Sequence, residues 1–329
     1  MTDFKNLNSE NFNNGFLKNR LIKLALKILI TVGVFYYISE NIRFSEVFLQ
    51  FKNSNHLLLF LVIILGFVNI TFQYFKWKLS VTYLLNNSEP KKILFSLLQG
   101  FSAAIFTPAR LGEYVGRAIQ FTDKSFFQVV LATLIDKLFS ILVVILLGSI
   151  STIIFIHTFY EAYILITISL IIVLSIFYYL IFLLLFNNNF WENMFFEKIS
   201  KSVRLNKYFK KFEILKNLDN NFKIKMLILS LVFYLCILIQ YAFLVVAFSN
   251  NYNLLEYLWV GNLIMFTKTI VPAYTFGELG IRESASIYFI QKIGENATVG
   301  FNASIFLFLI NIVFPALLGL ILNLRNNNE

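Results

Sequence analysis

Residues 107–119 read T-P-A-R-L-G-E-Y-V-G-R-A-I, within a chain that is otherwise rich in Ile, Leu and Phe. Pro108 has no backbone N–H and fixes φ, so a helix that arrives through Phe101–Phe106 must break or kink at this point. Gly112 and Gly116 allow neighbouring backbones to approach closely, and with Pro108 they are candidate hinge residues. The stretch therefore predicts a broken helix rather than a continuous span.

The same stretch carries three charged residues. Arg110, Glu113 and Arg117 recur at i, i+3 and i+7, so they share one face if a helix resumes, and Glu113 and Arg117 have the favourable i,i+4 spacing. Charges beside a backbone break are costly at membrane depth, unless they are buried in protein or line a water-filled cavity. The pattern predicts a polar site between apolar segments.

The pattern occurs again at residues 271–283, which read V-P-A-Y-T-F-G-E-L-G-I-R-E. Aligned on the acid, Gly277-Glu278-x-x-x-Arg282 matches the first motif, and each motif follows a proline by a few residues. The chain holds only 4 prolines, so this repetition indicates a pair of matched sites. Each motif alone is also compatible with a helix start and a local ion pair. The second motif adds Pro272, Gly277 and Gly280 as candidate hinges and Glu278, Arg282 and Glu283 as candidate site residues.

The composition is that of a polytopic α-helical membrane protein. Of 329 residues, 58% are hydrophobic and 14% are charged, whereas soluble domains carry about 25% charge. Long unbroken apolar runs exclude an outer-membrane barrel, whose strands alternate. The net charge of +10 lies in connecting segments, which favours membrane topology over nucleic-acid binding.

Catalytic and metal-binding motifs are missing from the sequence. The single Cys236 excludes a disulfide within the chain and a thiolate metal cluster. The sequence contains no phosphate loop, dinucleotide fingerprint or serine-hydrolase elbow. We therefore expect no cofactor, no metal site and no enzymatic activity.

Apolar runs predict a single transmembrane domain with about six full spans and two re-entrant or broken helical hairpins. The expected spans are residues 21–37, 57–75, 126–155, 163–186, 226–248 and 299–322. Residues 93–106 are too short to cross ~30 Å of hydrocarbon, which needs about 20 residues. The domain is expected at residues 18–323, with a basic cytoplasmic insert at 187–225 and polar tails at 1–17 and 324–329.

The positive-inside rule predicts that the two motifs enter the membrane from opposite faces. It places the N-terminus, residues 76–92 and the basic insert in the cytoplasm. Residues 93–124 must then enter and leave on the cytoplasmic face, while residues 254–298 form a hairpin from the other face. Matched motifs that arrive from opposite sides are expected of an inverted repeat with a site near the midplane.

Three further charges lie within apolar segments. Asp136 and Lys137 are adjacent, and since such neighbours do not share a helix face, their partners must lie on other helices. The alternative is that Lys137 extends to the interface. Lys268 is expected to line the cavity of the second motif or to extend to the outer interface.

The two motifs carry a family resemblance. P-A-R-L-G-E-Y-V-G-R at 108–117 and P-x-x-x-x-G-x-L-G-I-R-E at 272–283 resemble signatures of the lysylphosphatidylglycerol synthase transmembrane-region family. This is a flippase-like membrane module that, in bifunctional enzymes, is fused to a soluble aminoacyl-transfer domain. Weaker similarities are Phe75-Lys76-Trp77 and Ile135-Asp136-Lys137-Leu138. The likeness covers residues 18–323.

The chain departs from the family pattern at two places. Gly277-Glu278 stands where the family usually has paired glycines, and Asp136 stands where relatives more often carry Glu-Arg. No soluble domain follows Leu322, so the resemblance implies the translocating half alone. It also implies a bacterial inner-membrane protein, whose N-terminus the positive-inside rule places in the cytoplasm.

The leading hypothesis is a translocase for a membrane lipid or a lipid-linked headgroup. The arginines would pair with a phosphate, and the glutamates would neutralise them in the empty state or meet a cationic headgroup. The expected partners are lipids with phosphate-bearing headgroups. The candidate translocation residues are Arg110, Glu113, Arg117, Glu278, Arg282, Glu283, Asp136 and Lys268.

Two alternatives belong to other classes of protein. One is an intramembrane enzyme that modifies a lipid or polyprenyl carrier, with Glu113 or Glu278 as general base. The other is a non-catalytic partner of a lipid or glycan synthase. A homo-oligomer is compatible with all three hypotheses.

Overall fold

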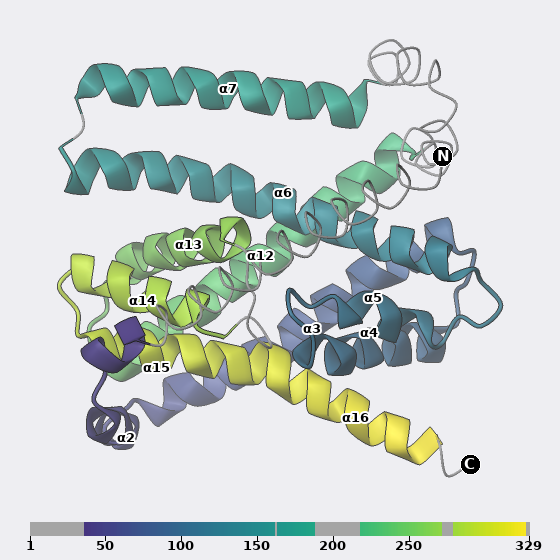
Figure 1. Ribbon diagram of the computed structural model, residues 1–329, viewed down its shortest axis with the longest axis horizontal. Helices are drawn as coiled ribbons and strands as arrows, with labels where there is room; N and C mark the ends of the chain where they lie inside the picture. Colours follow the sequence, from purple (N-terminus) through teal and green to yellow (C-terminus); the bar gives the residue numbers. More distant parts are fainter. Residues whose placement is uncertain (1–35, 162, 188–217, 272–278, 327–329) are drawn as a thin grey trace, which may run out of the picture.

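The computed structural model describes residues 36–161, 163–187, 218–271 and 279–326, and this part of the chain is helical, without strands. Within it, five helical runs are long and apolar enough to cross a membrane (Figure 1). They are α3 (His56–Leu84), α6 (Phe126–Phe159), α7 (Ile164–Phe186), α12 (Asn220–Ser249) and the continuous run Ala297–Leu322. This confirms the all-α polytopic fold. The expected first span at 21–37 and most of the basic insert lie outside the described residues.

The last of these runs has three parts. It begins as α15 (Ala297–Phe308), widens into the π-helix Leu309–Val313 and continues as α16 (Phe314–Asn326). A short helix at the other end of the sequence, α2 (Phe44–Lys52), packs against α15. Thr298 donates a hydrogen bond to Glu46 on this contact, 3.2 Å long, which fixes α2 at one end of the bundle.

The first broken hairpin consists of α4 (Pro90–Ile105) and α5 (Gly112–Ala118). With 16 residues, α4 is about 24 Å long, shorter than the ~30 Å hydrocarbon core. The two helices are antiparallel, since Ser96 donates to the Arg117 carbonyl (2.7 Å) and Gln120 to Gln99 (3.1 Å). The hairpin therefore returns to the end of the bundle where it began.

The second hairpin consists of α13 (Leu254–Ile270) and α14 (Ile281–Lys292). Glu295, just after α14, accepts hydrogen bonds from Tyr257 (2.6 Å) and from Asn251 (2.9 Å), at the start of α13. This hairpin also returns to the end where it began.

The two halves follow the same order of elements. The series α3, α4, α5, α6 corresponds to α12, α13, α14 and the run from α15 to α16. The contacts correspond as well: α6 packs on α13 as α16 packs on α4, and α3 packs on its counterpart α12 (Figure 1). Two glycines lie at the matched crossings, Gly148 against Phe266 and Gly319 against the Leu98 backbone. The fold is an internal two-fold repeat.

The repeat is inverted. Asn55, at the start of α3, donates its backbone N–H to the Ala247 carbonyl near the end of α12, at 2.9 Å. At the other end, the ring of Tyr83 stacks on that of Phe222, near the start of α12, with centroids 4.6 Å apart. The equivalent helices α3 and α12 therefore run in opposite directions, as the matched motifs predicted.

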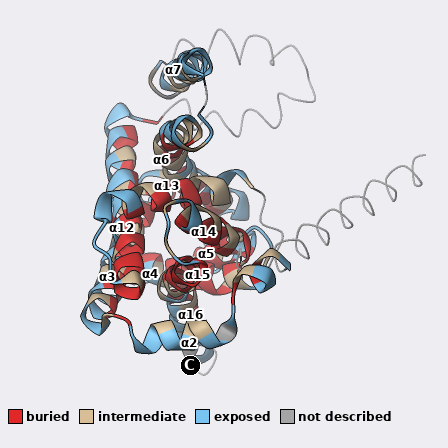
Figure 2. Ribbon diagram, turned by 90° about the vertical axis from the view of Figure 1, so that its left-hand side faces the viewer, coloured by how far each residue is buried: buried red, intermediate tan, exposed pale blue. Residues whose placement is uncertain are grey.

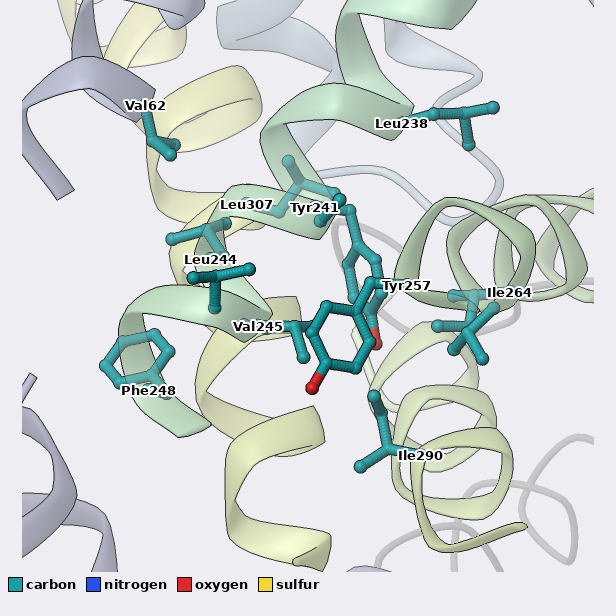
Figure 3. Packing of buried hydrophobic residues seen from close by; sticks show 14 of the residues in the cluster. Val62, Leu238, Tyr241, Leu244, Val245, Phe248, Tyr257, Ile264, Ile290 and Leu307 are labelled. Atoms are coloured by element: carbon teal, nitrogen blue, oxygen red, sulfur yellow. The ribbon is translucent and has the colours of Figure 1, made fainter. Parts of the chain in front are cut away.

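The largest apolar core surrounds α12 (Figure 3). Tyr241 and Leu244 of α12 meet Val62 of α3, Tyr257 of α13 and Leu307 of α15 there. By contrast, α7 lies at the edge of the bundle against α6, and none of its residues from Ile164 to Leu183 is buried (Figure 2). The core thus joins the two repeats and leaves α7 outside them.

Candidate functional site

The helix break predicted at Pro108 is present. After α4, Ala109 (φ 51°) and Arg110 (φ 55°) both adopt the left-handed conformation, which costs an L-residue roughly 1–2 kcal/mol. Thr107 closes the turn, because its hydroxyl accepts the Gly112 N–H at 2.7 Å. Strained residues of this kind persist where the surroundings hold them, and they cluster at functional sites.

The candidate hinge glycines have different roles. A Cβ on Gly112 would lie 2.1 Å from the Ala103 carbonyl oxygen, and one on Gly116 would lie 2.4 Å from that of Gln99. These two glycines thus permit close packing of α5 on α4. Gly280 has φ 102°, which favours glycine, directly before α14. The candidates Pro272, Gly277 and Glu278 lie outside the described residues.

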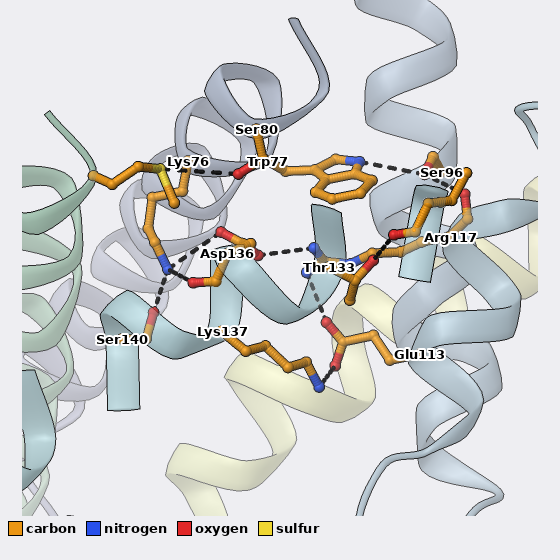
Figure 4. Close-up of polar contacts among 12 residues, drawn as sticks. Lys76, Trp77, Ser80, Ser96, Glu113, Arg117, Thr133, Asp136, Lys137 and Ser140 are labelled. Atoms are coloured by element: carbon orange, nitrogen blue, oxygen red, sulfur yellow. Dashed lines mark hydrogen bonds and ion pairs between the residues drawn. The ribbon is translucent and has the colours of Figure 1, made fainter. Parts of the chain in front are cut away.

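Glu113 is surrounded by three cations, of which Figure 4 shows Arg117 and Lys137. Its carboxylate lies 2.6 Å from Arg117 Nη2, 3.2 Å from Arg110 Nη2 and 2.8 Å from Lys137 Nζ. The first motif therefore forms its expected i,i+4 ion pair and adds a partner from α6.

Asp136 joins the first motif to α3. One of its oxygens accepts from Arg117 Nη1 at 2.8 Å, and the other lies 3.4 Å from Lys76 Nζ. Lys76 also donates to the Asp136 carbonyl and to Ser140 (Figure 4). As predicted from their adjacency, Asp136 and Lys137 find their partners on other helices.

Burial makes this network unusual. Glu113 and Arg117 are each 3% exposed and Lys76 is 4% exposed. Charges so buried are tolerated only when they are paired. Lys76 was missed as a site residue because the span was expected to end at residue 75, whereas α3 continues to Leu84 and carries Lys76 inside.

The cations of the site lie over aromatic rings. The closest is Arg117, whose guanidinium is 4.4 Å from the Trp77 ring centroid. The others are Lys137 over Tyr114 (4.9 Å), Lys76 over Phe233 (5.2 Å), Arg282 over Phe308 (5.3 Å) and Arg110 over Phe101 (5.6 Å). Such contacts contribute about 0.5–2 kcal/mol each, more where water is excluded.

The second motif forms a smaller network. Arg282 Nη2 donates to Glu283 at 2.6 Å and its Nε donates to Ser304 at 3.1 Å. Glu283 also accepts the Gly280 N–H at 2.6 Å and so caps α14. The Glu283 carboxylate is therefore engaged by Arg282 and by the backbone at the start of α14. Arg282 also lines a cavity between the two repeats.

Both motifs meet at one cavity of about 400 Å³ between the repeats. Helices of both repeats line it, and Asn69, Val144, Tyr234 and Asn311 place it near the middle of the long spans. Its charged lining residues are Lys76, Arg110, Glu113, Arg117, Asp136, Lys137, Lys268 and Arg282. The structure thus brings together the described candidates, including Lys268, apart from Glu283.

The cavity reaches the molecular surface. Its lining residues Ala109, Ile141 and Thr269 are exposed, and they come from the turn after α4, from α6 and from the end of α13. Near this opening, the side chains of Lys137 and Arg110 are 24% and 17% exposed.

Amide side chains form the neutral wall of the cavity. Asn69 donates to Asn311 at 2.7 Å and to Gln240 at 3.2 Å, and Asn311 donates to Gln240 at 3.1 Å. Asn311 lies in the π-helix, a distortion that is frequent at functional sites. These residues were not predicted as site residues, and isolated amides inside apolar spans were the only signal for them.

Comparison with known proteins identifies the family. A family model described as lysylphosphatidylglycerol synthase TM region matches residues 24–319, nearly the whole chain. Searches of curated proteins and of solved structures returned no match.

Proposed function

Because the chain belongs to the lysylphosphatidylglycerol synthase TM region family, we propose that it carries the headgroups of membrane lipids between the two leaflets. The family links the chain to membrane lipids. The observation that carries the proposal is the charged cavity at mid-depth between inverted repeats. In transporters built this way, the substrate site lies near the bilayer midplane.

The opening of the cavity fits a substrate with apolar tails. The lining residue Ile141 is exposed, and its neighbours Leu134 and Leu138 on α6 are exposed as well. While the headgroup occupies the cavity, the acyl chains of the lipid would extend through this opening and stay in the surrounding lipid. Only the polar part of the substrate then needs a protein path, since hydrocarbon is costly for charges.

The cations near the opening are suited to a phosphate. Arg110, Lys137 and Lys268 line the cavity, and arginine in particular binds phosphate through two parallel hydrogen bonds. Glu113 holds Arg110 and Lys137 when no substrate is bound. A phosphate that enters would replace this carboxylate as their partner.

An intramembrane enzyme with Glu113 as general base is a weaker reading. A base must face the proton that it removes, within hydrogen-bond reach. The Glu113 oxygens already contact Arg110, Arg117 and Lys137. This arrangement favours an electrostatic role for Glu113 over proton transfer.

Translocation of acyl-labelled lipids in proteoliposomes tests the proposal. We expect movement with the wild-type protein and rates lowered about tenfold or more in Arg110→Gln and Lys268→Gln, since a charged hydrogen bond contributes about 1.5–3 kcal/mol. These residues are preferred to Glu113 and Arg117, whose buried ion pair holds α5 in place.

Lys92→Gln is the matched control. Lys92 pairs with Glu89 at 2.8 Å on the exposed start of α4 and does not line the cavity. Its rate should equal that of the wild type. If the wild-type protein moves no lipid in a panel that includes polyprenyl-linked lipids, the enzyme or synthase-partner hypothesis replaces this one.

A further inference from the structure

The carboxylates of the cavity are already engaged by the protein's own cations. Glu113 contacts Arg110, Arg117 and Lys137, and Asp136 contacts Arg117 and Lys76. A ligand ammonium group would have to displace one of these cations to gain a carboxylate partner.

Two aromatic rings of the cavity lining also lie beneath the protein's own cations. Proteins also bind ammonium groups over aromatic rings. Of the described aromatic residues that line the cavity, Phe101 lies beneath Arg110 and Phe233 beneath Lys76, while Tyr234 has no cation over it. The nearby rings of Trp77, Tyr114 and Phe308, outside the lining, also lie beneath cations. The lining carboxylates and two of the three described lining rings are therefore already paired with the protein's own cations.

The net charge of the cavity lining also disfavours a cationic ligand. Among the described residues, six cations and two carboxylates line the cavity, an excess of four positive charges. If Glu278 of the second motif were counted as a further lining acid, the excess would still be three. A cationic headgroup would add to this excess, whereas a phosphate would reduce it.

We propose that the cavity selects lipids whose headgroup has a net negative charge and no ammonium group, in preference to zwitterionic or aminoacylated lipids. This inference rests on the proposed lipid translocation and defines its substrate class. The phosphate contacts the cations near the opening. Gln73, which lines the same cavity, offers a neutral hydrogen-bond partner to hydroxyl groups of the headgroup.

The test compares three lipids with identical labelled acyl chains in wild-type proteoliposomes. Phosphatidylglycerol is anionic, phosphatidylethanolamine is zwitterionic and lysylphosphatidylglycerol is cationic. We expect phosphatidylglycerol to move about tenfold or more faster than the cationic lipid, which corresponds to loss of about one charge contact. Equal rates, or a faster cationic lipid, would overturn the inference while translocation itself stands.

If no lipid moves, the proposed function fails and binding decides the inference. Lipids titrated onto the purified protein and counted by native mass spectrometry should bind in the order anionic, zwitterionic, cationic. Equal binding would overturn the selectivity. Uptake of soluble glycerol phosphate without lipid movement would show that the site takes a free phosphate ester, which also contradicts the inference.

Lys137→Gln provides the sharpest variant. It removes one of the two cations at Glu113 Oε2, where Arg110 remains at 3.2 Å, together with the cation over the Tyr114 ring, and so frees a position for a ligand ammonium group. The preference for phosphatidylglycerol over lysylphosphatidylglycerol should fall about tenfold. Lys92→Gln changes the net charge equally and should leave the preference unchanged. An unchanged preference in Lys137→Gln would contradict the proposal.

Discussion

At the scale of single residues, Asp136 is the anion shared by two buried cations. Asp136→Asn would leave Lys76 without a carboxylate partner, because its nearest anionic contact is this one at 3.4 Å. Removing one member of a buried ion pair costs about 3–5 kcal/mol. We therefore expect a large loss of stability, measured as the free energy of unfolding in detergent.

Lys76→Met is the informative comparison. It leaves Asp136 paired with Arg117 at 2.8 Å and replaces the lysine by an apolar side chain of similar length. The loss should be clearly smaller than for Asp136→Asn. Equal losses in the free energy of unfolding would show that the contact between Asp136 and Arg117 contributes nothing to stability, contrary to the observed geometry.

The sequence revealed some of these residues and concealed others. Arg110, Glu113 and Arg117 were predicted because a proline and two glycines mark their surroundings, and the adjacency of Asp136 and Lys137 predicted partners on other helices. The amides at Asn69 and Gln240 were not predicted. An isolated amide has no spacing partner in the sequence, and its role depends on contacts between helices distant along the chain.

At the scale of elements, the seating of α5 on α4 depends on Gly116. A Cβ at this position would lie 2.4 Å from the Gln99 carbonyl oxygen, so the helices would have to separate. Overpacking of this kind costs about 1–3 kcal/mol. Gly116→Ala should lower the free energy of unfolding by that amount, with a matching fall in thermal stability. Val115→Ala, on the exposed side of the same helix, should have a much smaller effect, and similar losses would exclude close packing as the cause.

The hairpins were predicted because their apolar runs are short and end at a proline. The prediction succeeded for α4 and α13, whose lengths the sequence limits directly. The predicted end of the long span α3 was less accurate, because α3 extends to Leu84, beyond the expected residue 75. Lys76 and Lys78 look like the end of a span, but burial of Lys76 against Asp136 keeps the helix inside the protein.

At the scale of the whole molecule, the inverted repeat was visible in the sequence only at the two motifs. Apolar residues replace one another freely in lipid-facing helices, so the rest of each half did not lead to a prediction of the repeat. The contacts recover the relation, because α6 meets α13 as α16 meets α4. The relation explains why two motifs 165 positions apart, as from Arg117 to Arg282, line one cavity.

The arrangement predicts which loops share a side of the membrane. If α4 and α5 form a re-entrant hairpin, the loops before and after it lie on one side, while those next to α2 and after α12 lie on the other. The basic residues Lys91, Lys92 and Lys124 favour the cytoplasm for the first group.

Single cysteines in a Cys236→Ala background test this arrangement with a membrane-impermeant maleimide. The exposed positions Ser88 and Asp123 should label only in inside-out vesicles, and Asn53 and Asn251 only in right-side-out vesicles. Ser88 and Asp123 share a side because the hairpin returns to the end where it began. Labelling of these two from opposite sides would mean that the hairpin crosses the bilayer. The matched motifs would then not reach the cavity from opposite faces, and the case for a midplane site would lose its geometric basis.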